Sequence, residues 1–369
     1  MSEVIGSHHQ ISLKEKLIIF FDDAKEIDLR LKAAQEFSDA FEYSAQNSDY
    51  PEVLKELYER SQKFLMQTEP QFLQENPLQQ LRKQCLELFQ KVPHNEHNKQ
   101  YSKLFMNVLM KLVEYENEEN TMICVKLLVD IHKSQRPNFS NEVINFLKFV
   151  RNVYKELQNH TNKIFTHSPF YEIDSIDEFP IETKVLETFT VTKIHTKQKD
   201  MNDNKIDFNI LPKSCYSLKV MQEIPVLLVL MYQFHKSYIT NEIASFIPLI
   251  MEFLNLIPSE AQKKDEHFNE TLYLDFLAAQ VKTLSFLAYV VKFFKKPLME
   301  KYADSLVQGM YRMIVNIPSN VTNMRKEYFI AARHILGTQE IKPRFVKVLS
   351  DLMNEDILIG NGYTVNQLL

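Results

Sequence analysis

Apolar residues recur along most of the chain at the spacing of an α-helix, which has about 3.6 residues per turn. Three clear stripes lie within Leu104–Leu112, Ile243–Ile257 and Tyr302–Ile317. Residues that typically begin or end helices lie between these stripes. Asn76 precedes Pro77, a combination typical of a helix cap followed by the first helical position. We therefore expect an all-α fold.

The predicted helices follow one another in pairs of about 40 residues, the length of HEAT-type repeats. A pair of this kind cannot bury its apolar faces alone, so stacked pairs form a continuous core. We therefore predict an α-solenoid of antiparallel helix pairs, with Gly337 ending one helix. The predicted pairs are Tyr101–Glu114 with the helix around Met122–Ile131, Leu218–Lys236 with Asn241–Ile257, Leu272–Phe294 with Leu298–Ile317, and Met324–Leu336 with Lys342–Met353.

A cluster of acids precedes one of these helices, at Glu114, Glu116, Glu118 and Glu119. Asn117 is a suitable N-cap, which places Glu118 and Glu119 in the first turn, where negative charge favours the helix dipole. A calcium loop would need alternating oxygen ligands and a sharp glycine turn. We interpret the cluster as a helix start whose acids face solvent.

The helical pattern breaks once, at residues 168–214. This segment contains Pro169, Pro180 and Pro212 and the polar run His195–Asp207, with weak strand-like alternation at Glu187–Lys193. We predict a long, irregular and partly disordered insertion. The predicted domains are N-terminal helical repeats at 1–167, the insertion at 168–214, and a second block of repeats at 215–369 that stops within a repeat. An abrupt stop after Thr364 suggests a piece of a longer protein.

Composition excludes several classes of function. Five glycines in 369 residues leave little room for phosphate-binding loops. A net charge of −5 argues against a general nucleic-acid surface. Three separated cysteines give neither a disulfide framework nor a zinc site. Apolar runs such as Ile224–Tyr232 are shorter than the ~20 residues that cross a bilayer.

For each residue that could take part in catalysis or metal binding, a structural role is the better interpretation. His94, Glu96 and His97 lack the further ligands that a metal site requires. Gly360-Asn361-Gly362 lacks the lysine of a phosphate loop. We therefore predict no catalytic, cofactor-binding or metal-binding residues and no cofactor. Structural roles are also expected for the remaining candidates, the helix-end histidines His132 and His334, the cysteines Cys85, Cys124 and Cys215, and the cations Lys292, Lys295 and Lys296.

Five collinear segments resemble the N-terminal region of the transformation/transcription domain-associated proteins. The resemblance covers roughly Pro77–Leu369 and is weak in the first 75 residues and in the insertion. The segments are VPHNEHNKQYSKLFMNVLMKLVEYENEENTMICVKLLVDIHKSQRP from Val92, LKVMQEIPVLLVLMYQFHK from Leu218, LYLDFLAAQVKTLSFLAYVVKFF from Leu272, MRKEYFIAARHILGT from Met324 and EDILIGNGYT from Glu355.

The resemblance implies a nuclear, non-enzymatic scaffold. Proteins of this family are very large helical-repeat relatives of the phosphatidylinositol-3-kinase-related kinases, and their kinase-like domain lacks catalytic residues. They belong to SAGA-type and related histone acetyltransferase complexes and link transcriptional activators to chromatin acetylation. The implied partners are subunits of such complexes and activators, with no small-molecule substrate, membrane or direct nucleic-acid binding expected.

Several alternatives stay open at this point. They are another helical-repeat adaptor such as a nuclear-transport receptor, a helical enzyme with a polar pocket around His94 and His97, and a truncated product without independent function. For acidic activator segments, basic strips beside apolar grooves would be required, and Arg325, Lys326 and Arg333 form one candidate strip.

Overall fold

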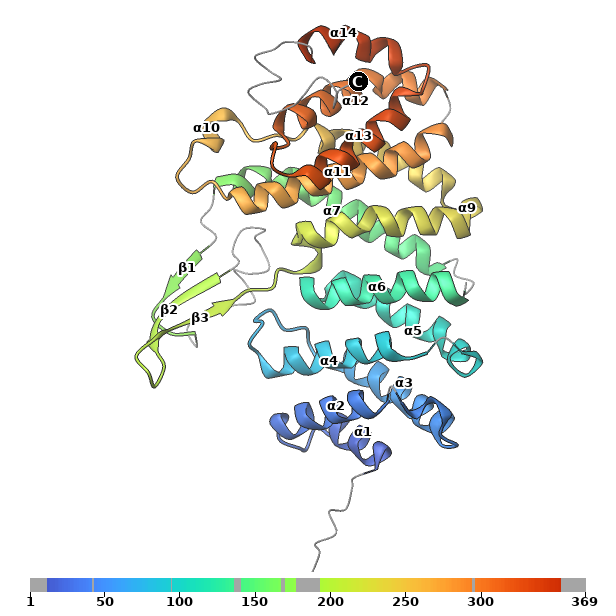
Figure 1. Ribbon diagram of the computed structural model, residues 1–369, viewed down its shortest axis with the longest axis vertical. Helices are drawn as coiled ribbons and strands as arrows, with labels where there is room; N and C mark the ends of the chain where they lie inside the picture. Colours follow the sequence, from blue (N-terminus) through green and yellow to red (C-terminus); the bar gives the residue numbers. More distant parts are fainter. Residues whose placement is uncertain are drawn as a thin grey trace, which may run out of the picture. The chain divides into compact units, whose positions relative to one another are not determined.

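The computed structural model describes residues 12–41, 43–93, 95–135, 141–166, 170–176, 193–293 and 296–352. The chain divides into two compact units, Met1–Asn138 and Phe139–Leu369. Both units are built from helices, so the predicted all-α solenoid is confirmed (Figure 1). The predicted domain boundaries at 167 and 214 stay a prediction.

The first unit is a two-layer stack. Helices α1, α3 and α5 pack against one another in sequence, and so do α2, α4 and α6 (Figure 1). Each helix thus lies beside the helix two places along the chain, as stacked repeats require. We call such neighbours same-layer helices. Their bounds are α1 (Leu13–Phe21), α2 (Ile27–Phe41), α3 (Tyr50–Gln67), α4 (Pro77–Lys91), α5 (Glu96–Tyr115) and α6 (Glu118–Gln135), with a short 3-10 turn η1 (Ser44–Gln46) after α2.

The predicted hairpin of α5 and α6 is confirmed, because these two helices pack directly against each other. Along α6, exposure is confined to a narrow polar strip with Lys126, Asp130 and Lys133. The apolar stripe predicted on α5 is correct except at Leu104, which is 59% exposed. Spacing alone placed Leu104 beside Phe105 and Val108, but the packed face of the helix is narrower than the stripe.

The second unit repeats the same-layer arrangement. Its helices are α7 (Asn141–Thr166), α9 (Leu218–Asn255), α10 (Glu260–Lys263), α11 (Glu270–Val290), α12 (Lys296–Asn316), α13 (Thr322–Leu336) and α14 (Lys342–Leu352), with 3-10 turns η3 (Ser214–Tyr216) and η4 (Val291–Phe293). Helix α11 packs mainly against α9 and α13, whereas α12 packs mainly against α9 and α14.

These contacts correct part of the predicted pairing. We predicted that α14 pairs with α13, but α14 packs mainly against α12. Likewise α11 contacts α13 far more than it contacts α12. In the second unit the more extensive packing is thus between same-layer helices, whereas in the first unit α1 with α2 and α5 with α6 pack most extensively.

Helix α9 combines the two helices predicted at Leu218–Lys236 and Asn241–Ile257. His235 has non-helical backbone angles (φ −127°, ψ 32°), so α9 consists of two helices that meet at a bend close to the break that the sequence predicted. Pro225 and Pro248 also lie within α9. Each removes one backbone donor, which a helix tolerates at a cost in stability.

Helix α11 is, within the described residues, the one helix that is both long and apolar enough to be compared with a membrane span. The 24-residue segment Glu270–Phe293 is long enough to cross a membrane and contains an 18-residue window with a mean hydropathy of 1.4, contrary to our expectation that every apolar run is too short. However, 61% of its apolar window is buried within the protein. Packing against α9 and α13 accounts for this composition, so α11 is the core helix of its layer.

The segment that breaks the helical pattern contains a small sheet in its described part. Strand β2 (Lys193–Lys199) pairs in parallel with β1 (Phe170–Ile173) and antiparallel with β3 (Lys205–Asn209). The polar run that we expected to be irregular therefore forms a hairpin, whose turn holds Asp203 at φ 64°. Lys199 and Asp203 form an exposed ion pair at 2.6 Å across this turn.

Candidate functional site

The histidines that we considered and rejected as metal ligands form no metal site among the described residues. Glu96 and His97 are exposed in the first turn of α5, and the Glu96 carboxylate lies 3.8 Å from the Lys99 ammonium. His94 lies outside the described residues, as does Gly360-Asn361-Gly362. Within the described ranges no three His, Cys, Asp or Glu side chains gather as metal ligands would. The expectation that the chain binds no metal stays a prediction.

His132 occupies a different environment from the one that the sequence suggested. We expected a charge near a helix end, but its side chain is only 1% exposed, and Nδ1 lies 2.9 Å from the Leu128 carbonyl oxygen. It therefore serves the core of the first unit. His334 is exposed on α13.

Two of the cysteines are poor nucleophiles in the folded protein. Cys85 and Cys124 are completely buried. Burial raises the pKa of the Cys85 thiol to about 12 and the pKa of Cys124 well above its ordinary value. Since the thiolate is the reactive form, neither thiol is activated. Cys215 is half-buried in η3.

The acid cluster starts helix α6 as predicted, but one of its members is not solvated. Asn117 caps the helix by accepting a hydrogen bond from the Asn120 N–H at 3.0 Å, and Glu118 and Glu119 lie in the first turn. Glu116 is 0% exposed and forms an ion pair with the equally buried Arg82 of α4. The prediction of a solvated acidic face is therefore wrong for Glu116.

Arg82 and Glu116 are the centre of a buried polar network. The Arg82 Nε donates to Glu116 Oε1 at 2.9 Å, and Arg82 Nη1 donates to the Thr68 carbonyl at 2.8 Å. Asn120 Nδ2 donates to Glu116 Oε2 at 3.1 Å, and Gln79 links Asn117 to Asn120. Each charge is thus surrounded by hydrogen-bonding partners. The network joins the end of α3 to α4 and α6, and it is structural.

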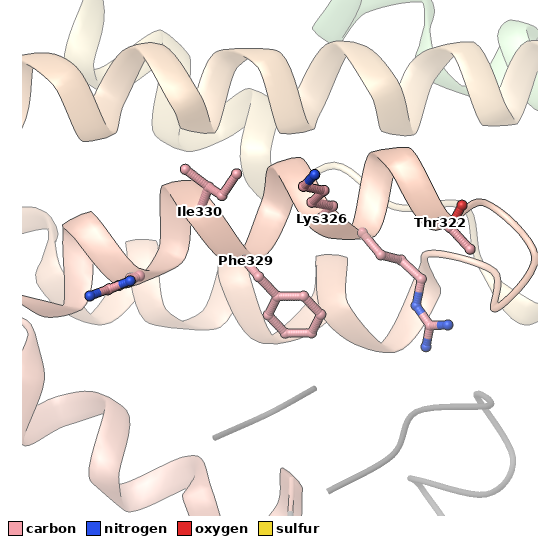
Figure 2. A pocket seen from close by; sticks show the side chains of 6 residues that line it. Thr322, Lys326, Phe329 and Ile330 are labelled. Carbon is pink, nitrogen blue, oxygen red and sulfur yellow. The ribbon is translucent and has the colours of Figure 1, made fainter. Parts of the chain in front are cut away.

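The described surface is hollowed along α13, in a groove of about 410 Å³ that we call the α13 groove. Figure 2 shows its lining side chains, all from this one helix. Ile330 is 53% exposed, an unusual position for a large aliphatic side chain, and Phe329 is half-buried beside it. The lining residues are Thr322, Arg325, Lys326, Phe329, Ile330 and Arg333.

The α13 groove is basic. Lys326 and Arg333 are exposed at either end of the apolar pair, and within the described residues neither forms an ion pair. No acid lines the groove. An uncompensated positive rim around an apolar floor favours a ligand with the opposite charge and its own apolar face.

Arg325 does not belong to the exposed strip that we proposed from the sequence. Its side chain is 5% exposed, and its Nη1 donates to the Ser319 carbonyl at 3.0 Å. It therefore holds the chain leading into α13. The sequence missed Phe329 and Ile330, although an apolar pair between Lys326 and Arg333, on the polar side of an amphipathic helix, was a usable signal.

A second hollow of about 550 Å³ lies between α11 and α13 and shares Ile330 with the α13 groove. It adds Tyr289, Lys292 and His334 to the lining. The ammonium groups of Lys236 and Lys292 each lie 5.0 Å from the centre of the Phe293 ring. Lys295 is outside the described residues, and Lys296 begins α12. The basic character thus continues from α13 to the end of α11.

Comparison with known proteins places the chain among transcription-associated proteins. A family model described as the Tra1 HEAT repeat central region matches residues 272–369. Transcription-associated protein 1 of Drosophila melanogaster is 36% identical over 358 residues, which are 97% of this chain. The human transformation/transcription domain-associated protein is 38% identical over 93% of the chain.

A more distant relative is the SAGA complex/NuA4 acetyltransferase complex subunit TRA1 of Saccharomyces cerevisiae, 28% identical over 95% of this chain. The chain spans 9% of the length of the fly and human proteins and 10% of the yeast protein. The resemblance seen in the sequence is therefore confirmed over nearly the whole chain, and the chain corresponds to one region of the TRRAP/Tra1 family of transcription-associated proteins.

Proposed function

We propose that the chain is a non-enzymatic scaffold segment of a SAGA-type or NuA4-type histone acetyltransferase complex in the nucleus. The observation that carries the proposal is the same-layer stacking of helices in both units, in a chain related to a SAGA/NuA4 subunit. In the described part, the buried polar groups Arg82, Glu116 and Gln280 connect helices to one another. Side chains that hold helices together in this way support a scaffold role.

The scaffold would act by geometry, holding several proteins on exposed helix faces at fixed separations. We propose that subunits of the acetyltransferase complex are the stable partners and that transcriptional activators are transient ones, so that activators direct acetylation to chromatin. A net charge of −5 supports protein partners over nucleic acid.

Affinity purification tests this proposal. The tagged full chain is expressed in cells, recovered from nuclear extract, and analysed by mass spectrometry. We expect acetyltransferase-complex subunits to be retained at a level well above that of a tagged, unrelated helical-repeat protein. Recovery of transport factors that a GTPase releases would instead support the alternative of a nuclear-transport receptor. Absence of both groups of proteins would contradict the scaffold assignment.

A separate measurement addresses the enzyme alternative. A thermal-shift screen of the purified chain with divalent metals and nucleotides should give no change in melting temperature. For metals the reason is that no three His, Cys, Asp or Glu side chains gather among the described residues, and for nucleotides it is that five glycines leave little room for a phosphate-binding loop. A reproducible increase with one ligand that disappears in His97→Ala would support a helical enzyme. Lys126→Ala, an exposed change on α6, is the matched control.

A further inference from the structure

We propose that Thr338 is a phosphorylation site and that the hollow of about 550 Å³ between α11 and α13, which Thr338 lines, holds the phosphate. An ATP-dependent serine/threonine kinase makes the modification. Thr338 Oγ1 bonds to the γ-phosphorus of ATP, the bond from that phosphorus to ADP breaks, and the hydroxyl proton passes to a base of the kinase. The inference goes beyond the proposed function, because it does not depend on which complex contains the chain.

The hollow carries positive charge that no lining acid balances. Lys292 of α11 and His334 of α13 line it, and none of its lining residues is acidic. The Lys292 ammonium lies 5.4 Å from the centre of the Tyr289 ring and 5.0 Å from that of Phe293, and these cation–π contacts hold it in place. His334 adds a ring N–H donor. A positioned cation beside a neutral donor is suited to bind an anion.

Thr338 is the hydroxyl of this hollow that a kinase can reach. It lies in the loop between α13 and α14, half-buried between the exposed Gly337 and Gln339. Ser285 also lines the hollow, but it lies inside α11 and donates to the Val281 carbonyl at 3.1 Å. A loop residue can be presented to a second protein, whereas a residue inside a packed helix requires local unfolding. The hydroxyl of Thr338 is therefore the acceptor.

A third cation lies on the turn that leads into α14. The Thr338 carbonyl accepts a hydrogen bond from the Lys342 N–H at 3.0 Å, which is the spacing of one helical turn. Side chains four residues apart in such a turn lie on the same side, so the exposed Lys342 is within reach of a phosphate on Thr338. Within the described residues neither Lys292 nor Lys342 forms an ion pair.

The balance of charges decides whether a phosphate is stabilised at this position. The C-terminal end of α13 carries a partial negative charge of about half an elementary charge, which disfavours an anion. Two full positive charges, on Lys292 and Lys342, outweigh it. A phosphothreonine carries about −1.5 to −2 charges at neutral pH, enough to bind both ammonium groups. The phosphate therefore connects α11 to the start of α14 and orders the loop between α13 and α14.

The first experiment asks whether the modification is made. The purified full chain is incubated with nuclear extract, magnesium and ATP, and phosphopeptides are located by mass spectrometry. We expect phosphate on Thr338. Thr338→Val, which replaces the hydroxyl by a methyl group, should remove this phosphopeptide and leave any others unchanged. Phosphorylation of added casein verifies that the kinases of the extract are active, so a missing phosphate on Thr338 is informative.

The second experiment asks whether the hollow holds the phosphate. Phosphoserine is incorporated at position 338 during translation and compared with Thr338→Ser by hydrogen exchange. Amide exchange in residues 330–345 should be at least about fivefold slower with the phosphate, because charge-assisted hydrogen bonds oppose local opening. Lys292→Ala should abolish most of this slowing. Lys301→Ala should preserve it and is the matched control, because Lys301 is exposed and likewise lies 5.0 Å from the centre of a tyrosine ring.

Each experiment has a result that overturns the inference. In the first, it is the absence of phosphate on Thr338 while casein is phosphorylated. In the second, it is exchange that is unchanged or faster with phosphoserine, or a slowing that Lys292→Ala leaves intact. Each variant is compared with and without phosphate, so the structural effect of the substitution itself cancels. Neither measurement depends on acetyltransferase-complex subunits, so failure to recover those subunits would leave this inference standing.

Discussion

Single buried residues determine how the helices of the first unit register against one another. Arg82 is completely buried, yet each of its donors has an acceptor on α3 or at Glu116. Replacing a buried ion pair by apolar residues is often tolerated, whereas removing one partner leaves an uncompensated charge. The network therefore holds α3, α4 and α6 in one alignment. The protein is strongly destabilised only when one partner of the ion pair is removed and the other stays.

The first prediction concerns this asymmetry. Arg82→Met should lower the free energy of unfolding by about 3–5 kcal/mol, because Glu116 remains charged in a buried position. The double variant Arg82→Met/Glu116→Leu should lower the free energy of unfolding less, by on the order of 1–3 kcal/mol. This loss arises because the carbonyl groups of Leu65 and Thr68 lose a donor. Urea denaturation followed by circular dichroism measures both.

Lys126→Met, an exposed change on α6, is the control and should have little effect. Equal destabilisation by the single and double variants would show that the charge left on Glu116 is not the cause.

At the scale of elements, close approach and bending of helices matter most in the second unit. Gly309 lies in the interior of α12, where glycine is usually unfavourable. A Cβ atom built at Gly309 would lie 3.2 Å from the Leu254 carbonyl oxygen and 3.3 Å from the Leu254 Cβ. The absence of a side chain therefore lets α12 approach α9 closely.

We expect Gly309→Ala to destabilise the protein. The higher helix propensity of alanine contributes about 1 kcal/mol, but overpacking against α9 costs about 1–3 kcal/mol. The net loss should appear as a lower denaturation midpoint by circular dichroism. Gln308→Ala, at the exposed neighbouring position, should change the midpoint little. A raised midpoint for Gly309→Ala would mean that α9 and α12 can move apart at no cost.

The bend in α9 predicts a pH dependence. His235 is 6% exposed, and burial lowers its pKa below the ordinary value of 6.5. Its unfolded form binds a proton more readily than its folded form. The stability of the protein should therefore fall as pH drops below about 6.5, by at most about 1.4 kcal/mol per pH unit for this one proton.

His235→Gln removes this titration, so the free energy of unfolding should vary less between pH 7 and pH 5.5 than in the wild type. The exposed His97→Gln is the control. If the pH dependence of His235→Gln equals that of the wild type, other groups cause the acid sensitivity.

For the whole molecule, division into two units implies that stability is local. In stacked repeats each element is stabilised chiefly by its neighbours. The Arg82 network lies entirely within Met1–Asn138, and the Gly309 contact lies within Phe139–Leu369. Perturbations at these two positions should therefore act on different parts of the chain.

Hydrogen exchange followed by mass spectrometry tests this expectation. Arg82→Met should accelerate amide exchange in α3, α4 and α6 and leave α11 and α12 nearly unchanged. Gly309→Ala should do the opposite. Equal acceleration throughout the chain in either variant would show that the two units unfold as one cooperative body.

The sequence was a good guide to helices and a poor guide to their partners. Helix existence follows from local signals such as the Asn76–Pro77 cap and the apolar period of α12, which the structure reproduces. Pairing does not, because the same apolar face can pack on either neighbour. The α13 groove illustrates the limit, since the sequence identified Lys326 and Arg333 but also included the buried Arg325.

By itself, the sequence determined the all-α class, the repeat-like organisation and, through long collinear segments, the TRRAP/Tra1 family, since periodicity, capping and order along the chain are local or linear properties. Only the tertiary structure decided which charged side chains are buried and which stay exposed to solvent. Glu116 and Glu119 are three residues apart in one acidic run, yet the first is enclosed beside Arg82 and the second stays partly exposed beside Lys83. That difference depends on residues about 35 positions away, brought together by stacking.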